Sequence, residues 1–144
     1  MRYEQQTGWA AADAERAFGK ALRARRRASM LRRLRRKCIE CAKLAIFDSA
    51  AERRTGPRGV RDIPLDAIVG SFEPHRAEQF DHEFRPSARS RGRWPRVWLA
   101  EQRGAVLPPI AVASVGDAYA IRDGHHRVSV ARARGALTIS AVVA

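Results

Sequence analysis

The residues of this chain best suited to chemistry form one continuous run, called here the turn motif: Asp123, Gly124, His125, His126 and Arg127. An alternating apolar segment, residues 118–121, precedes the turn motif, and a helix-favouring segment follows it as far as Gly135, so the pattern predicts a strand, a tight turn and a helix. The first N–H groups of a helix lack intrahelical partners, and the helix dipole favours negative charge there. Because His126 and Arg127 add donors beside those groups, the run predicts a phosphate-binding site.

A purely structural interpretation fits the same run. Asp123 would cap the helix, and Arg127 would pair with a carboxylate elsewhere. The two histidines would be exposed polar residues of the first helical turn. An isolated Asp-Gly with basic neighbours does not separate the two interpretations.

Positive charge is the outstanding feature of the composition. The 144 residues include 28 Lys and Arg against 15 Asp and Glu, which gives a formal net charge of +13. Residues 1–60 account for +10 of this charge, with 16 basic and 6 acidic side chains. The attraction to polyanions that such a charge implies therefore belongs mainly to the N-terminal part of the chain.

The densest charge lies within a long helical pattern. Residues 9–54 are rich in Ala, Leu and Arg and contain no Pro, which predicts helix. The basic block of this helix consists of Arg23, Arg25, Arg26, Arg27, Arg32, Arg33, Arg35, Arg36 and Lys37. Its density favours contact with nucleic-acid phosphates, although a solubilising face is the ordinary role of a charge run. The apolar stripe lapses between Leu22 and Leu31, which fits either a bend between two helices or the solvated middle of one helix.

Cys38 and Cys41 are the only cysteines and have C-x-x-C spacing within the same pattern. A zinc site needs four ligands, and no other Cys or His occurs in the first 74 residues. We therefore predict no metal site and interpret the pair as two small residues on a helix face. No apolar run of about 18 residues occurs, so no transmembrane helix is predicted. Without the apolar core of a secretory signal, we expect a cytoplasmic protein with no membrane partner.

Two parts of the chain are separated by a short Gly- and Pro-containing linker, residues 55–59. Residues 1–55 are predicted to form a basic α-helical arm, and residues 60–144 a domain. In the domain, Trp94 and Pro95 begin a predicted helix to about residue 103, and strands at 110–115 and 118–122 flank a Gly-Asp hairpin turn. A final strand, residues 137–143, completes a compact βαβ crossover, for which a parallel, right-handed connection is predicted.

The irregular segment 70–93 is long for a plain connection. Its carboxylates Glu78, Asp81 and Glu83 could supply a general base or bind a metal ion, although a solvated surface position is the commoner role of each. Phe80 and Phe84, four residues apart, are predicted to anchor the segment to the core. Core packing is likewise predicted for the tryptophans of the following helix.

From about residue 60 to residue 144 the chain resembles the ParB/sulfiredoxin superfamily. In order along the chain, the matching features are Ile63-Pro64-Leu65-Asp66-Ala67-Ile68, Leu107-Pro108-Pro109-Ile110-Ala111-Val112, the hairpin, the turn motif and the closing strand. The resemblance implies an α+β fold, a small mixed β-sheet with flanking helices, which the basic helical arm precedes here. It also implies a nucleoside triphosphate, ATP or CTP, bound with Mg²⁺ at the turn motif. Members include nucleotide-dependent DNA clamps, the sulfinic-acid reductase sulfiredoxin and a free-serine kinase.

Differences at the turn motif narrow these implications. Partition proteins commonly have Gly-Glu-Arg-Arg, of which only Gly124 and Arg127 are present, and no helix-turn-helix domain follows, so a sliding clamp is not expected. Sulfiredoxin has Gly-Cys-His-Arg, whereas this chain has His125 in place of the reactive cysteine, so sulfinic-acid reduction is not expected. Kinase-type phosphoryl transfer is compatible with an Asp-Gly-His turn.

Two main hypotheses for function follow. In the first, the domain binds a nucleotide, and phosphotransfer is a further activity that this binding would allow. Gly124 and the next N–H groups would cradle phosphate, and His126 and Arg127 would neutralise its charge. Asp123 would orient His125 or bind Mg²⁺, so Asp123, His125 and His126 are the candidate catalytic residues. In the second, a non-enzymatic protein binds nucleic acid through the basic block and keeps the domain as a scaffold. A protein-interaction module is a third alternative.

Overall fold

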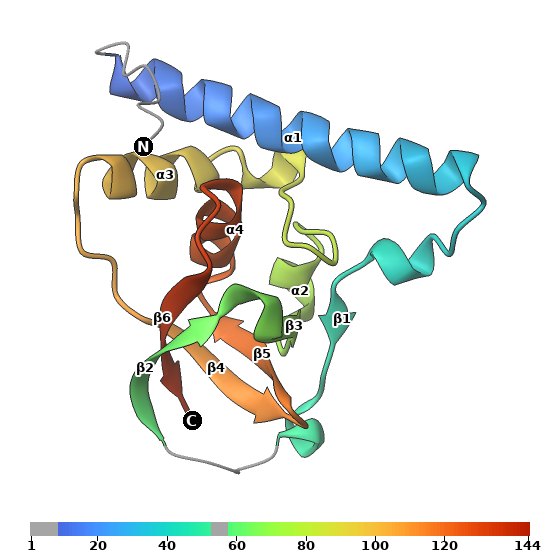
Figure 1. The fold of residues 1–144 in the computed structure, drawn as a ribbon, viewed down its shortest axis with the longest axis vertical. Helices are drawn as coiled ribbons and strands as arrows, with labels where there is room; N and C mark the ends of the chain where they lie inside the picture. Colours follow the sequence, from blue (N-terminus) through green and yellow to red (C-terminus); the bar gives the residue numbers. More distant parts are fainter. Residues whose placement is uncertain (1–8, 53–57) are drawn as a thin grey trace.

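The computed structural model describes residues 9–52 and 58–144, which form an α+β fold around a six-stranded mixed sheet (Figure 1). The strands are β1 (Ala45–Ile46), β2 (Gly59–Pro64), β3 (Ile68–Ser71), β4 (Ile110–Val115), β5 (Ala118–Asp123) and β6 (Thr138–Val143). The α-helices are α1 (Ala10–Leu34), α2 (Pro74–Ala77), α3 (Trp94–Gln102) and α4 (His125–Ala133). Single 3-10 turns occur at Glu40–Ala42, Ser49–Ala51, Leu65–Ala67 and Ala88–Ser90. The predicted fold class is confirmed.

The sheet has the strand order β1-β3-β5-β4-β6-β2. Strands β4 and β5 form the predicted antiparallel hairpin, and Gly116, with φ of 60°, supplies the left-handed backbone that its tight turn requires. On one side of the hairpin β3 runs parallel to β5, and on the other β6 runs parallel to β4. The sheet therefore grows outward from the hairpin in both directions.

The predicted parallel crossover through α4 is wrong. Strand β6 pairs with β4 rather than β5, and β4 is antiparallel to β5. Asp123, the last residue of β5, lies opposite Ala111, while Ala141 of β6 lies opposite Ile110. The connection from β5 to α4 and the connection from α4 to β6 both lie at the N-terminal end of β4. The chain therefore re-enters the sheet at the end where it left, and β6 is antiparallel to β5.

Two apolar clusters hold the layers together. The first lies on the sheet and includes Phe80 and Phe84, which are 2% and 1% exposed, so their predicted anchoring is confirmed. The second joins α1, α3 and α4 and is centred on Phe18 and Trp94, whose ring centroids are 5.6 Å apart. Trp94 also donates from Nε1 to Oγ of Ser129 at 2.8 Å, which satisfies the only polar atom of its side chain.

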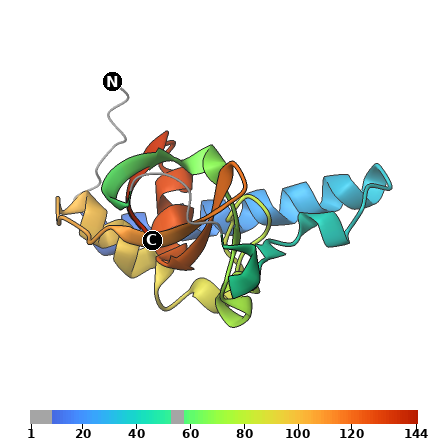
Figure 2. The same ribbon diagram turned by 90° about the horizontal axis from the view of Figure 1, so that it is seen from below.

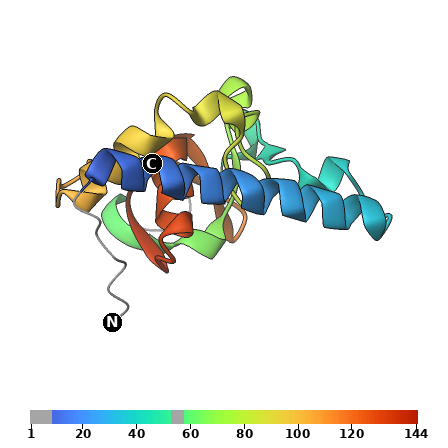
Figure 3. The ribbon, with the colours of Figure 1, turned by 90° about the horizontal axis from the view of Figure 1, so that it is seen from above.

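Helix α1 is a single continuous helix that lies across the rest of the molecule (Figure 3), and its C-terminal half extends beyond the sheet (Figure 2). Its buried positions, Ala14, Phe18 and Ala21, all belong to its first half. No helix in the described ranges is long and apolar enough to cross a membrane.

The helix prediction for residues 9–54 is wrong beyond Leu34. Arg36 has a left-handed backbone, with φ of 50°, and the chain then turns back toward the sheet. There β1 pairs with β3, and Leu44 is 4% exposed in the main core. Strand pairing and burial of Leu44 thus outweigh the local helix propensity. Part of the segment assigned to the basic helical arm supplies the edge strand of the sheet.

Candidate functional site

The turn motif lies where β5 ends and α4 begins, as predicted. Gly124 precedes the helix with φ of +107°, a conformation that side-chain-bearing residues rarely adopt. A Cβ atom at this position would lie 2.4 Å from Cγ2 of Ile110 in β4. The glycine is therefore required by the fold itself, because it allows α4 to approach the sheet.

Both histidines of the turn motif are buried, so the interpretation that they are exposed residues of a first helical turn is wrong. His125 is 1% and His126 is 8% exposed. Nε2 of His125 lies 2.6 Å from Oγ of Ser71 in β3. Within the described residues, Nδ1 of His125 and Nε2 of His126 have no hydrogen-bond partner. Both rings contact Phe80, with centroid distances of 6.2 and 5.1 Å.

Burial also sets the charge of these rings. Desolvation, reinforced by the nearby Arg76 guanidinium and by His126, lowers the pKa of His125 from 6.5 to about 4. Desolvation, reinforced by Arg93 and Arg76, lowers the pKa of His126 to about 4 as well. At neutral pH both imidazoles are uncharged. They can exchange hydrogen bonds with a ligand but offer no positive charge to a phosphate.

The charged members of the turn motif are paired. Asp123 lies between two guanidinium groups, 2.6 Å from Nη1 of Arg76 and 3.1 Å from Nη2 of Arg127. The hydrogen bond from Arg76 is the main cause of the lowered pKa of Asp123. Arg127 also donates from Nη1 to the carbonyl oxygens of Pro108 and Pro109, at 2.5 and 3.1 Å. Its side chain, 16% exposed, thus ties α4 to the chain entering β4.

These contacts limit the chemistry available at the turn. Asp123 is hydrogen-bonded to arginines, and no bond joins it to either histidine among the described residues. The Ser71–His125 pair resembles a nucleophile with its base, but Ser71 is 0% exposed and its Oγ accepts the N–H of Glu73 at 2.9 Å. The catalytic assignment of Asp123, His125 and His126 stays a prediction. The feature most suited to an anion is the start of α4, which has no side-chain cap.

Arg76 and Ser71 also belong to this site, although they lie far from the turn motif in the sequence. Arg76 is 47 residues from Asp123, and Ser71 is 54 residues from His125. Pairing of β3 with β5 brings them in, because Ser71 lies opposite Ile121 in that register. A polar residue ending an apolar segment is the one available signal for Ser71.

The three candidate carboxylates of segment 70–93 form hydrogen bonds or ion pairs with other residues of the same segment. Asp81 is 7% exposed and accepts from the backbone N–H groups of Glu83 and Arg85. Arg85 also pairs with both Asp81 and Glu83. Glu78 pairs with Arg89 on the surface. These pairs hold the loop in shape and give the three carboxylates structural partners.

The basic block has a different environment. Seven residues of the block are exposed, and we call the six that follow Arg23, on α1 and in the turn after it, the basic surface: Arg26, Arg27, Arg33, Arg35, Arg36 and Lys37. Across residues 9–52 and 58–144, no hydrogen bond or ion pair involves any of these six side chains. Two other members of the block hold the helix in place. Arg25 donates to the carbonyl oxygen of Gln79 at 3.2 Å, and Arg32 donates to that of Cys38 at 3.0 Å.

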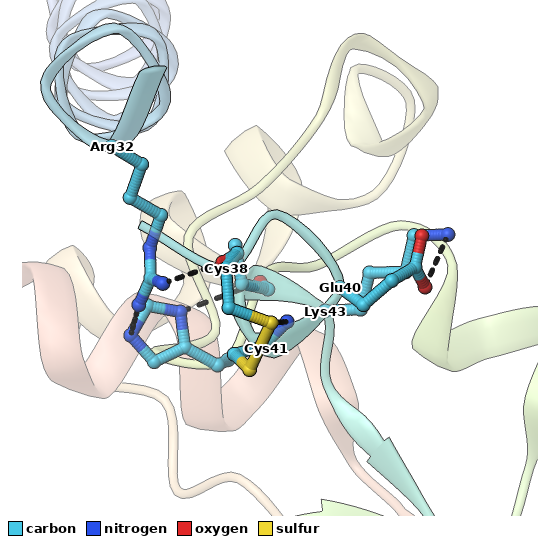
Figure 4. Close-up of a disulfide and its surroundings, with 7 residues drawn as sticks. Arg32, Cys38, Glu40, Cys41 and Lys43 are labelled. Carbon is cyan, nitrogen blue, oxygen red and sulfur yellow. Dashed lines mark hydrogen bonds and ion pairs between the residues drawn. A yellow bond between two sulfur atoms is a disulfide. The ribbon is translucent and has the colours of Figure 1, made fainter. Parts of the chain in front are cut away.

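A disulfide joins Cys38 to Cys41 in the turn after α1 (Figure 4). The prediction of two small residues on a helix face is therefore wrong. Both cysteines are exposed, and Sγ of Cys38 accepts the N–H of Cys41 at 3.1 Å. Where the structure describes the chain, no group of three or more His, Cys, Asp or Glu side chains could hold a metal ion.

No family model matches the chain, and no curated protein sequence matches it. Among solved structures, the crystal structure of sulfiredoxin from Arabidopsis thaliana is similar, with a TM-score of 0.44 and 18% sequence identity. The similar region covers 59% of this chain and 83% of that chain.

Proposed function

We propose that this protein binds nucleic acid through the basic surface, by contacts with phosphates rather than by reading the base sequence. The observation that carries the proposal is the set of six exposed cationic side chains without a carboxylate partner in the described residues. Such cations attract phosphates, and the release of counterions from the nucleic acid drives the association. No recognition helix of a helix-turn-helix pattern accompanies them, so base-specific readout is not proposed.

Pairing with a carboxylate is common elsewhere in the molecule, and the basic surface differs from exposed arginines such as Arg96 and Arg103 in that its cations lie close together at one end of α1. Arginines with a carboxylate partner include Arg85, Arg89, Arg91, Arg122, Arg127, Arg132 and Arg134. A net charge of magnitude about 2 to 8 suffices for the solubility of a small domain. The charge of +13 exceeds that range, so solubility alone does not account for the basic surface.

The salt dependence of binding tests this proposal. If the six cations neutralise four to six phosphates, log affinity should fall linearly with log salt concentration, with a slope of about −4 to −5. The double variant Arg26→Gln/Arg33→Gln should make the slope less steep by about 2. The matched control, Arg96→Gln/Arg103→Gln, removes the same charge from exposed positions at α3 and should leave the slope nearly unchanged.

Two results would contradict nucleic-acid binding through this surface. Equal loss of affinity in both double variants would assign the binding to net charge rather than to the basic surface. No binding of the wild-type protein to any oligonucleotide at 50 mM salt would remove the proposal itself.

A nucleotide-phosphate site at the turn motif is a second candidate, with ATP or CTP and Mg²⁺ as the ligand. It is favoured by the start of α4, whose first N–H groups have no side-chain cap and lie beside two arginines. The engagement of Arg127 and the neutral histidines weigh against it. Thermal-shift titration with ATP or CTP and Mg²⁺ tests it, and no shift at millimolar nucleotide would exclude the site.

A further inference from the structure

A groove of about 460 Å³ lies between α1 and the loop around Pro86. One wall is a single face of α1, because Leu22, Arg26, Met30 and Arg33 follow one another at intervals of three or four residues. The opposite wall is formed by Pro86 and the two residues after it. The groove therefore adjoins the basic surface and shares Arg26 and Arg33 with it.

Hydrogen bonds fix the two walls relative to each other. Nη1 of Arg25 and the N–H of Ser87 both donate to the carbonyl oxygen of Gln79, at 3.2 and 2.8 Å. The loop is closed by a bridge between Phe80 and Pro86, and the ring of Phe80 is buried in the core. A wall held in this way needs little ordering when a ligand binds, so the groove is preformed.

The lining combines two chemistries. Leu22 and Met30 supply apolar surface, whereas Arg26 and Arg33 supply unpaired positive charge. Ser87, which also lines the groove, has a hydroxyl group without a hydrogen-bond partner among the described residues. Apolar walls add nothing for a bare phosphate, and unpaired guanidinium groups disfavour a purely apolar ligand. The matching ligand has a flat, weakly polar body attached to phosphates.

We propose that this groove binds one unstacked base of a single-stranded nucleic acid, with the adjoining phosphates on Arg26 and Arg33. A base can pack against Leu22 and Met30, and the guanidinium planes provide further stacking surface. The volume lies within the range of about 300 to 1,000 Å³ that is usual for small-molecule pockets. In a duplex the same base would be stacked and paired, and the groove would be unused. The inference rests on the proposed function and specifies its substrate as single strands with exposed bases.

Two single-stranded probes of equal charge separate base binding from phosphate binding. One is a fluorescently labelled 12-mer of thymidine, and the other is a 12-mer of abasic residues with the same phosphates. Because one stacked base contributes substantially to binding, the full-length protein should bind the thymidine probe about tenfold more tightly. Equal affinity for the two probes would overturn the inference, while the salt dependence shown by both would still support the proposed function.

A pair of variants locates the base-dependent part of the affinity. Met30→Ser removes apolar surface from the groove, and Leu34→Ser makes a similar change on the same helix outside it; these side chains are 61% and 74% exposed. Met30→Ser should reduce the thymidine affinity to the abasic level without changing the abasic affinity, whereas Leu34→Ser should change neither. Equal effects of the two substitutions would place the base elsewhere and overturn the inference. Polyglutamate that displaces the labelled thymidine probe as well as unlabelled thymidine 12-mer of equal charge would assign the groove to an acidic protein partner instead.

Discussion

The turn motif and the basic surface both place arginine near a helix terminus, but at opposite ends of the helix dipole. Arg127 lies in the first turn of α4, where the dipole is positive, and Asp123 with two prolyl carbonyls compensates its charge. Arg33 of the basic surface lies in the last turn of α1, where the dipole is negative and itself favours cations. The comparison teaches that the sequence locates charge, whereas the fold decides whether that charge is available to a ligand.

The largest effect is expected from Gly124→Ala, which tests whether the turn motif serves packing. A left-handed alanine costs about 1 to 3 kcal/mol, and the contact with Ile110 adds about 1 to 3 kcal/mol of overpacking. Urea unfolding should show a loss of about 3 to 5 kcal/mol in the free energy of unfolding. The control is Gly92→Ala, because a Cβ at Gly92 meets no atom within 4 Å. A Gly124→Ala protein as stable as the control would show that α4 can move away from β4.

Acid sensitivity tests the neutrality of His125 and His126. Their pKa values are about 4 in the folded protein against an ordinary value of 6.5, so between these pH values the unfolded chain binds more protons. Each buried neutral ring makes its full contribution to stability above pH 6.5, and this contribution is lost as the pH falls toward 4. The loss in the free energy of unfolding is on the order of 3 kcal/mol per histidine. Unfolding at pH 7 and pH 4.5 should reveal this loss, and His126→Gln should reduce it. His75→Gln, an exposed control on α2, should not. Equal stability at both pH values would mean that the two rings take up protons as readily in the folded protein as in the unfolded chain, and burial would then not hold them neutral.

A smaller loss of stability is expected from Arg127→Ala. The substitution removes hydrogen bonds to Pro108, Pro109 and Asp123, which together should cost about 1 to 3 kcal/mol. Affinity of the folded variant for oligonucleotides should equal that of the wild type, because the guanidinium is engaged inside the fold. Reduced affinity with unchanged melting temperature would instead make Arg127 a ligand-binding residue.

Features with a local signal were predictable from the sequence, and features that depend on distant pairing were not. The hairpin at Gly116, the helix from Trp94 and the turn motif each combine turn chemistry with apolar periodicity within about a dozen residues. Strand β1 was not predictable, because Leu44 and its neighbours are helix-compatible until β3 offers a partner. The same holds for Arg76, whose partner Asp123 is 47 residues away. At the candidate sites, residue types were predictable but charge states and pairing were not.

The smallest effect on stability, and the sharpest contrast with Arg127, is expected from Arg27→Gln. Arg27 is exposed on α1, outside the groove and without a partner in the part of the chain that the structure describes, so the free energy of unfolding should change by no more than about 0.5 kcal/mol. Losing one phosphate contact should make the salt slope less steep by about 0.9 for a duplex oligonucleotide and by about 0.7 for a single strand. Lys20→Gln removes the same charge from an exposed position nearly two turns earlier on the same helix and should leave the slope unchanged. If Arg27→Gln and Lys20→Gln weaken binding equally, the whole exposed length of α1 attracts the ligand. If neither does, the unpaired charge of the basic surface has no role in binding, and the distinction between engaged and available arginines loses its functional meaning.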